Sequence, residues 1–270
     1  MDDLILLGVG VAVGAVGTLV GVGGGFLLVP ILLFLYPDDP PDVITSISLA
    51  VVFINAVSGS IAYGFQRRID YRVGLLLAMA TIPGSIVGAL VTTKIERELF
   101  TILFSVVLIV IALLLFLRPV ARERVASSTS RGWQRRTVDR AGIVYEYALP
   151  VLPALGLGLL VGFLSSLMGI GGGIIQVPAF ILLFGLPTYI ATATSQFMLV
   201  IMSLTGTTTH LVAGDAAEAA RRTLVLAPGV VVGAQVGALL SRRMQPIVIA
   251  RLLAVLMIVA AARLLTSEVL

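Results

Sequence analysis

Long apolar runs separated by short polar stretches make up most of this chain. An α-helix needs roughly 20 apolar residues to cross the hydrocarbon core of a membrane. Each half of the chain has the same order: a long run, a glycine cluster, a short run that cannot span alone, and three more long runs. The runs are 4–20, 26–36, 43–65, 73–93 and 99–117, then 149–168, 174–185, 188–213, 223–240 and 247–265. The pattern predicts an all-α polytopic membrane protein with about eight to ten helical elements.

The composition supports this class and excludes others. Hydrophobic residues make up 59% of the chain and charged residues 12%, whereas a soluble domain carries about 25% charged residues. A soluble enzyme, a disordered protein and a nucleic-acid binder are therefore excluded. The chain has no cysteine, which excludes a disulfide scaffold, thiolate metal sites and a thiol nucleophile. We expect neither a metal nor another cofactor.

Three motifs recur in the same order in both halves. The segment Gly21-Val-Gly-Gly-Gly-Phe-Leu-Leu-Val-Pro30 recurs as Gly169-Ile-Gly-Gly-Gly-Ile-Ile-Gln-Val-Pro178. Thr45-Ser46 aligns with Thr194-Ser195, and Pro83-Gly84-x-x-x-Gly88 aligns with Pro228-Gly229-x-x-x-Gly233. The offsets are 148, 149 and 145 residues. They predict two homologous transmembrane repeats, residues 1–117 and 148–270, joined by a solvated, arginine-rich linker at 118–147.

Positive charge predicts the orientation of the repeats. The loop with Arg67, Arg68 and Arg72 and the 118–147 linker are the most basic segments, and two full spans separate them. Both can therefore be cytoplasmic, with the acidic turn at 37–42 outside. If each glycine-broken pair folds back, the second repeat is inverted relative to the first; if each pair crosses once, the repeats are parallel. We favour inversion, because inverted repeats with broken helices are a common transporter design.

The glycine clusters suggest a binding site for an anion. Consecutive glycines break a helix, and the next half-helix begins with backbone N–H groups that have no intrahelical partner. Two such ends facing one cavity would bind an anion without arginine or lysine. The competing interpretation is close helix packing, which explains Gly84, Gly88, Gly229 and Gly233. A nucleotide-binding loop is excluded, because no Gly-Lys-Ser/Thr follows.

Neutral polar residues accumulate in and just after the short helical runs, and no Asp, Glu or Lys lies deep inside a confident span. Neutral donors suit a small oxyanion and suit a metal cation poorly. Each Ser or Thr has a competing role, because it can bond the carbonyl of its own helix. His210, the only histidine, is either a proton relay or an interface residue. The candidate ligand contacts are Thr45, Ser46, Asn55, Gln176, Thr194, Ser195 and Gln196.

The paired Gly-x-Gly-Gly-Gly-x-x-x-Val-Pro motifs, the Pro-Gly-x-x-x-Gly motif in each half and the basic central loop resemble the TauE/SafE family of sulfite exporters. The resemblance covers nearly the whole chain. It implies a bacterial-type plasma-membrane transporter of small sulfur-containing anions, commonly an exporter, with both glycine motifs lining a central site. Gln176 stands where the first copy has Leu28, so the two half-sites cannot bind identically. The implied lining residues are Gly21, Gly23, Gly24, Gly25, Gly169, Gly171, Gly172 and Gly173, with Pro30 and Pro178 as structural residues.

These observations predict a secondary transporter of an anion such as sulfite or sulfoacetate, working by alternating access. Its expected partners are the substrate and the lipid bilayer, and a homodimer is compatible with the sequence. An anion channel and an uptake permease are the alternatives. An intramembrane enzyme would need a nucleophile–base pair or buried carboxylates, and the sequence offers only His210 as a base.

Overall fold

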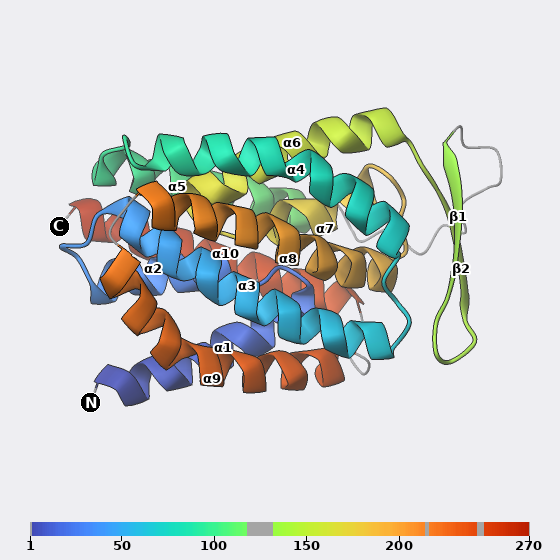
Figure 1. Cartoon of the computed structure of the whole chain (residues 1–270), viewed down its shortest axis with the longest axis horizontal. Helices are drawn as coiled ribbons and strands as arrows, with labels where there is room; N and C mark the ends of the chain where they lie inside the picture. The colour runs from blue at the N-terminus through green and yellow to red at the C-terminus, as the bar shows by residue number, and fades with distance from the viewer. Residues whose placement is uncertain (1, 118–131, 214–215, 242–245, 270) are drawn as a thin grey trace.

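Ten helices and one β-hairpin form the described part of the chain, residues 2–117, 132–213, 216–241 and 246–269 of this computed structural model (Figure 1). The first half contains α1 (Asp2–Val20), α2 (Gly25–Leu35), α3 (Pro41–Phe65), α4 (Tyr71–Thr92) and α5 (Arg97–Leu117). The second contains α6 (Val151–Met168), α7 (Gly173–Leu182), α8 (Thr188–Ala213), α9 (Ala216–Leu240) and α10 (Pro246–Val269). The predicted order of long and short helices is confirmed.

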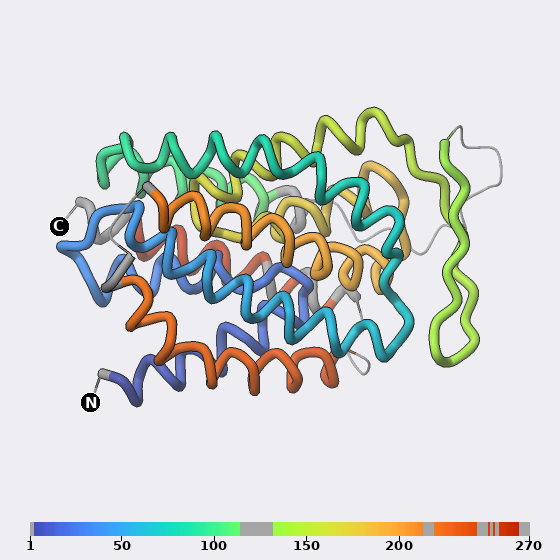
Figure 2. The backbone as a smooth tube through the Cα atoms, in the orientation of Figure 1, coloured from blue at the N-terminus to red at the C-terminus, as the bar shows by residue number. Residues whose placement is uncertain are grey.

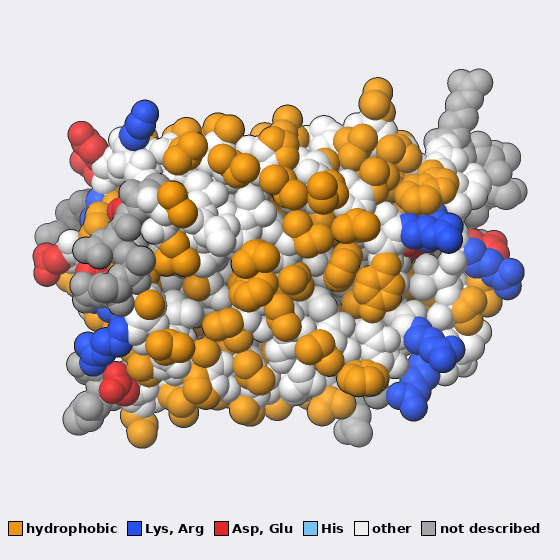
Figure 3. Space-filling model, in the orientation of Figure 1, with side chains coloured by type: hydrophobic (Ala, Val, Ile, Leu, Met, Phe, Trp, Pro, Cys, Tyr) orange, Lys and Arg blue, Asp and Glu red, His pale blue; other side chains and the backbone are white. Residues whose placement is uncertain are grey.

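The surface of the bundle suits a membrane. Six of the described helices, α1, α3, α4, α6, α8 and α9, are long and apolar enough to cross one. Large hydrophobic side chains such as Met79, Val106 and Val232 are exposed on the outer helices. Figure 3 shows hydrophobic side chains spread over the middle of the visible face, with charged side chains at its two ends. A soluble protein rarely exposes so much contiguous apolar surface, so the prediction of a polytopic helical membrane protein is confirmed.

Helices α3 and α8, the third helices of the two halves, run antiparallel at the centre of the bundle. A β-carbon placed on Gly59 of α3 would lie 2.6 Å from the side-chain nitrogen of Gln196, near the start of α8. A β-carbon placed on Gly206, further along α8, would lie 2.9 Å from Leu49, near the start of α3. The third helices of the two halves therefore point in opposite directions, which is the arrangement expected of an inverted repeat.

Each short helix returns toward the end from which the preceding long helix came. The backbone trace shows α1 running inward, α2 turning back, and α6 and α7 doing the same from the opposite end (Figure 2). The contacts between helices agree with this trace. Gly10 and Gly14 of α1 approach Leu226 and Val230 of α9 in the same order, so α1 and α9 are parallel. Helices α3 and α9 are parallel as well, since Ser58 bonds Gln235 and Gln66 bonds Ala238. Helices α1 and α3 therefore run in the same direction, and α2, which joins them in the chain, runs in the opposite direction.

Glycines bring the two halves into backbone contact along two matching seams. Helix α1 packs on α9, and α6 packs on α4. A β-carbon on Gly84 or Gly88 of α4 would lie 2.1–2.2 Å from carbonyl oxygens of α6, and one on Gly229 or Gly233 would lie 2.2–2.3 Å from carbonyl oxygens of α1. These glycines permit close helix packing, as the small-residue pattern predicted. Each half thus contributes its first helix to a seam with the fourth helix of the other.

Part of the predicted linker forms a β-hairpin, an element that the sequence analysis did not predict. Residues 118–131 lie outside the described part, but β1 (Trp133–Val138) and β2 (Val144–Leu149) form an antiparallel hairpin with Trp133 opposite Leu149. Burial alternates along β1, and inward side chains of β2 such as Tyr147 are buried. The high arginine count concealed this period-two pattern, so the sequence analysis did not predict the hairpin.

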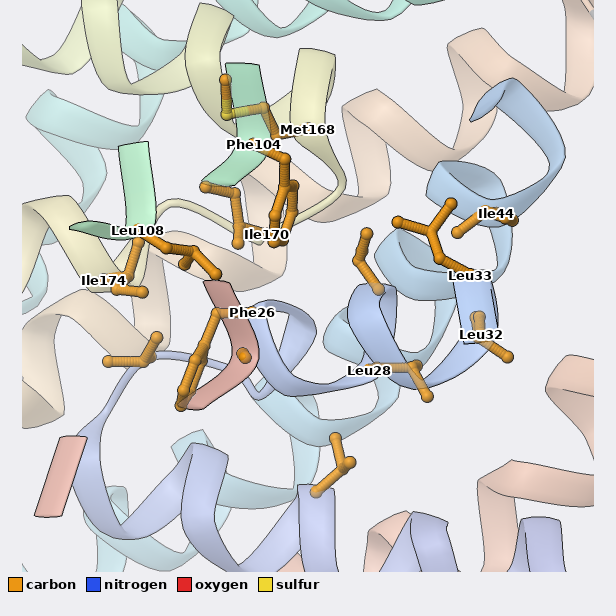
Figure 4. Packing of buried hydrophobic residues seen from close by; sticks show 14 of the residues in the cluster. Phe26, Leu28, Leu32, Leu33, Ile44, Phe104, Leu108, Met168, Ile170 and Ile174 are labelled. Atoms are coloured by element: carbon orange, nitrogen blue, oxygen red, sulfur yellow. The ribbon is translucent and has the colours of Figure 1, made fainter. Parts of the chain in front are cut away.

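One large apolar cluster fills the bundle beside the glycine segments. Phe26 of α2 and Ile170 and Ile174, which flank the start of α7, belong to it together with Phe104 and Leu108 of α5. Figure 4 shows these side chains converging from both halves of the chain. The first side chains of the two short helices thus point into the core, which anchors both helix starts.

Candidate functional site

Two glycine turns lie at the centre of the fold. Residues 21–25, the first glycine turn, join α1 to α2, and residues 169–173, the second glycine turn, join α6 to α7. Every residue of both turns is buried. Gly24 and Gly172 precede the short helices with φ of 86° and 73°, in the left-handed region that favours glycine. The matching conformations follow from the repeated sequence.

The two turns pack directly against each other. A β-carbon on Gly25 would lie 2.5 Å from the carbonyl oxygen of Gly169, and one on Gly173 would lie 2.7 Å from that of Gly21. Neither position has room for a side chain. The reciprocal contact brings the beginnings of α2 and α7 together, and close packing is therefore one reason for the glycines.

Unpaired backbone donors remain where the two short helices begin. Among the described residues, no hydrogen-bond acceptor is paired with the N–H groups of Gly24, Gly25 or Phe26, nor with those of residues 171–174. Buried N–H groups are almost always paired in proteins. These seven donors carry the partial positive charge of two helix starts. The place where the two glycine turns meet, called the crossing, therefore favours a ligand that supplies hydrogen-bond acceptors.

Gln176 adds a side-chain donor in the first turn of α7. Its side chain is buried, with 1% of the residue exposed. Its amide oxygen accepts a 3.1 Å hydrogen bond from the hydroxyl of Ser195, whereas its amide nitrogen has no partner among the described residues. Ser195 therefore fixes the amide so that its oxygen is occupied and its two N–H bonds are available. Leu28, the counterpart in α2, has no such donor, so the site is asymmetric.

Asn55 supports the first glycine turn. Its side-chain nitrogen donates to the carbonyl of Gly23 at 2.9 Å, and its side-chain oxygen accepts from the hydroxyl of Thr18 at 2.6 Å. Gln196 donates to the backbone carbonyl of Asn55 at 3.2 Å, and its own side-chain oxygen is buried without a partner among the described residues. Both groups of the Asn55 amide are occupied, so Asn55 positions the turn.

The other predicted contacts are distributed over the bundle. The hydroxyl of Thr45 donates to the carbonyl of Asp42 at 3.0 Å, although its backbone adjoins Gly169. Thr194 accepts from the N–H of Asp70 at the hairpin end of α4, so the structure does not bring it to the glycine turns. Ser46 is buried near the start of α3, and no hydrogen bond joins it to either turn among the described residues. Pro30 and Pro178 lie at matching places inside α2 and α7.

Contacts at the two turns correct the alignment of α3 with α8. A β-carbon on Gly21 would collide with Thr192, and the same atom on Gly169 would meet Thr45. Thr192 lies 147 positions after Thr45, so the offset of 149 residues that paired Thr45 with Thr194 is wrong by two. Ser48 then corresponds to Ser195.

The corrected alignment identifies two residues that the sequence analysis did not list as candidates, Ser48 and Tyr63. Ser48 donates a 2.6 Å hydrogen bond to the carbonyl of Gly169. Tyr63 donates to the carbonyl of Thr18 at 2.7 Å, and His210 occupies the equivalent place, with Nε2 3.3 Å from the carbonyl of Ser166. An alignment of Gly59 with Gly206 would have found all of these pairs.

Asp70 anchors the hairpin beside these helices. Its carboxylate accepts two hydrogen bonds from Arg135 of β1, at 2.8 and 2.7 Å, and one from Tyr147 of β2 at 2.8 Å. It also caps α4 by accepting from the N–H of Val73. Burial alone would raise the pKa of Asp70, but the hydrogen bonds from Arg135, Tyr147 and Val73 outweigh it and hold the pKa below its usual value. Ionised Asp70 therefore ties the hairpin to the start of α4.

The chemistry of the crossing points to an anion. Its free groups are backbone N–H donors and one amide, and among the described residues no cluster of three His, Cys, Asp or Glu could hold a metal. Oxyanions offer several acceptors to such donors.

Comparison with known proteins identifies the family. The model of the sulfite exporter TauE/SafE family matches residues 6–264. The chain belongs to this family. The resemblance that the paired glycine motifs suggested is therefore confirmed, and it covers nearly the whole chain.

Relatives of this TauE/SafE protein have names that indicate membrane transporters, not enzymes. The probable membrane transporter protein YunE of Bacillus subtilis is 34% identical over 98% of both chains. The probable membrane transporter protein MJ0441 of Methanocaldococcus jannaschii is 27% identical, over 77% of this chain and 72% of its own. A probable membrane transporter protein of Haemophilus influenzae is 29% identical, over 73% of this chain and 68% of its own. No solved structure matches the chain.

Proposed function

We propose that this chain is a secondary transporter that exports a small sulfur-containing oxyanion, such as sulfite or sulfoacetate. The anion binds where α2 and α7 begin, at the crossing of the two glycine turns. The observation that carries the proposal is a set of seven buried N–H groups, together with the amide nitrogen of Gln176, that have no acceptor in the part of the chain that the structure describes. The family description supports sulfite as a substrate.

Alternating access is the mode of transport that the packing supports. The glycine turns touch each other, so the centre is closed by backbone. An ion must then pass by a rearrangement of the two halves, and the matching seams of α1 with α9 and of α6 with α4 are where they would move. A continuously open channel would not need such a closure.

Direction follows from charge. We place the hairpin end, with its arginines, in the cytoplasm of a cell whose plasma membrane holds the protein. Moving one negative charge out of a cell whose interior is electrically negative is favourable by about 2.3 kcal/mol per 100 mV of membrane potential. Export can therefore run on the membrane potential, which agrees with the absence of Asp, Glu and Lys deep in the predicted spans.

Flux into proteoliposomes of the purified protein tests the proposal. Sulfite, sulfoacetate, thiosulfate and chloride are supplied singly, with and without a potential and a pH gradient. We expect saturable flux of a sulfur oxyanion, stimulated by the same anion on the far side and driven by the potential. Flux that does not saturate and shows no such stimulation would identify a channel, and preference for chloride would contradict the proposed substrate.

The variant Gln176→Leu tests the site itself. It gives α7 the residue that α2 has at Leu28, and we expect the KM to rise roughly 5- to 150-fold, because a donor hydrogen bond to an anion is worth about 1–3 kcal/mol. Gln235→Leu is the control, since it also removes a glutamine, but one whose amide nitrogen donates to Ser58 between α3 and α9. An unchanged KM in Gln176→Leu would remove Gln176 from the site.

A further inference from the structure

A cavity of about 450 Å³ opens at the hairpin end of the bundle, away from the glycine turns. It is lined by Gly64 and Phe65 at the end of α3, by Arg67 in the following loop and by Arg140 at the tip of the hairpin. Phe65 is the last residue of a helix that can span a membrane. The cavity therefore lies where such a span would reach the polar boundary of the bilayer.

The two arginines of this cavity have no carboxylate partner among the described residues, whereas Arg68 and Arg135 nearby do. Arg135 bonds Asp70, and Arg68 lies 3.7 Å from Asp139. Asp139 also accepts hydrogen bonds from two N–H groups of the hairpin tip and from Tyr145. The nearby acidic groups are thus engaged elsewhere, which leaves the positive charge of the cavity unbalanced.

Backbone hydrogen bonds fix the segments that carry the two arginines next to each other. The N–H of Arg67 donates to the carbonyl of Gly64 at 2.9 Å, and the N–H of Arg140 donates to the carbonyl of Gln66 at 3.0 Å. Arg67 has a φ of 55°, which is rare for a residue other than glycine. The hairpin tip is thereby fixed to the end of α3, and the two guanidinium groups are carried on adjacent, hydrogen-bonded segments.

An apolar stripe leads from the lipid-facing side of α3 to the same place. Ile61 and Phe65 are 54% and 69% exposed and lie one helical turn apart, and Tyr71 at the start of α4 is 54% exposed. Figure 3 shows Lys and Arg side chains at the hairpin end beside hydrophobic surface. An acyl chain can lie along such a stripe while its headgroup reaches the arginines.

From this combination we propose that the cavity binds the phosphate of an anionic phospholipid between Arg67 and Arg140. Guanidinium groups bind phosphate through paired, charge-assisted hydrogen bonds. Basic pockets at the ends of membrane helices are suited to anionic headgroups. The bound lipid would bridge α3 and the hairpin, which otherwise meet here through backbone contacts.

Lipid binding to the full chain tests this proposal independently of transport. The purified protein is titrated with phosphatidylglycerol or phosphatidylcholine, and bound lipid is counted by native mass spectrometry. A thermal-shift titration adds inorganic phosphate and glycerol phosphate, which have the headgroup chemistry without acyl chains. The variants are Arg67→Gln/Arg140→Gln, the charge-retaining Arg67→Lys/Arg140→Lys, and Arg136→Gln as control. Arg136 is on the same hairpin, exposed and paired with Glu146.

We expect one tightly held phosphatidylglycerol on the wild type and on Arg136→Gln, with affinity reduced about tenfold or more in Arg67→Gln/Arg140→Gln and partly restored in the lysine variant. Equal retention of phosphatidylglycerol in the wild type and the glutamine variant would overturn the site. Protection by inorganic phosphate as strong as that by phosphatidylglycerol would overturn the lipid as occupant. Equal binding of phosphatidylcholine would show that charge plays no part.

Discussion

Tyr63 closes the broken end of α1 by donating a 2.7 Å hydrogen bond from its hydroxyl to the carbonyl oxygen of Thr18. In the other half, His210 takes this place beside the carbonyl of Ser166 at the end of α6. Carbonyls near a helix end lack intrahelical partners and need donors from elsewhere. Each half therefore holds its glycine turn with a side chain from its third helix, a phenol in one half and an imidazole in the other.

Tyr63→Phe should loosen the first glycine turn without creating a cavity. Loss of one buried hydrogen bond costs about 0.5–1.5 kcal/mol, and the Thr18 carbonyl keeps its 3.0 Å hydrogen bond from the N–H of Gly21. We expect a lower unfolding temperature and a lower maximal flux with little change in KM. Tyr71→Phe is the matched control, because the hydroxyl of Tyr71 has no hydrogen-bond partner among the described residues and its ring contact with Phe197 remains. Equal effects of the two variants would contradict the structural role of Tyr63.

Gly172→Ala should be far more damaging than Gly185→Ala, although both glycines have positive φ, 73° and 66°. A β-carbon at 172 would lie 2.6 Å from the side chain of Met202, whereas at 185 nothing lies within 4 Å. We expect Gly185→Ala to cost about 1 kcal/mol from backbone strain alone. Gly172→Ala should cost more and abolish flux. Thermal unfolding and flux of both variants provide the comparison, and similar behaviour would mean that backbone conformation alone demands Gly172.

Local chemistry explains which features the sequence revealed. The glycine turns and the glycine seams could be predicted, because only a residue without a β-carbon tolerates such backbone and such contacts, and both leave a repeated pattern. The hairpin anchor could not, since Asp70 lies 65 residues before Arg135 and 77 before Tyr147 and meets them only after folding. Thr194 looked like a site residue because it is polar and lies within a span. Its partner is instead the backbone of Asp70.

The hairpin should undock at acidic pH. Because the pKa of Asp70 is lower in the folded protein than in the unfolded chain, its ionised form stabilises docking at every pH above the unfolded value of about 3.9. That contribution is lost as the pH falls through the lowered folded value. Trp133, the only tryptophan, lies under the guanidinium of Arg135, so its fluorescence reports the docked hairpin. We expect a stable signal from pH 7 to 5 and a change below about pH 4.

Asp70→Asn should produce the undocked signal already at neutral pH, with faster amide exchange across residues 133–149. Glu146→Gln is the control, since the pair of Arg136 with Glu146 is exposed and exposed pairs contribute little. An identical fluorescence and exchange profile for wild type and Asp70→Asn would show that the carboxylate does not hold the hairpin.

His210→Gln tests whether protons couple to transport. Nε2 of His210 lies beside the Ser166 carbonyl, and Nδ1 is buried with no partner among the described residues. A glutamine can still donate to that carbonyl but cannot take up a proton. If His210 couples, a pH gradient changes wild-type flux, and His210→Gln loses this response while keeping its KM and its response to the membrane potential. Equal pH-gradient responses in both proteins would exclude His210 as the coupling group.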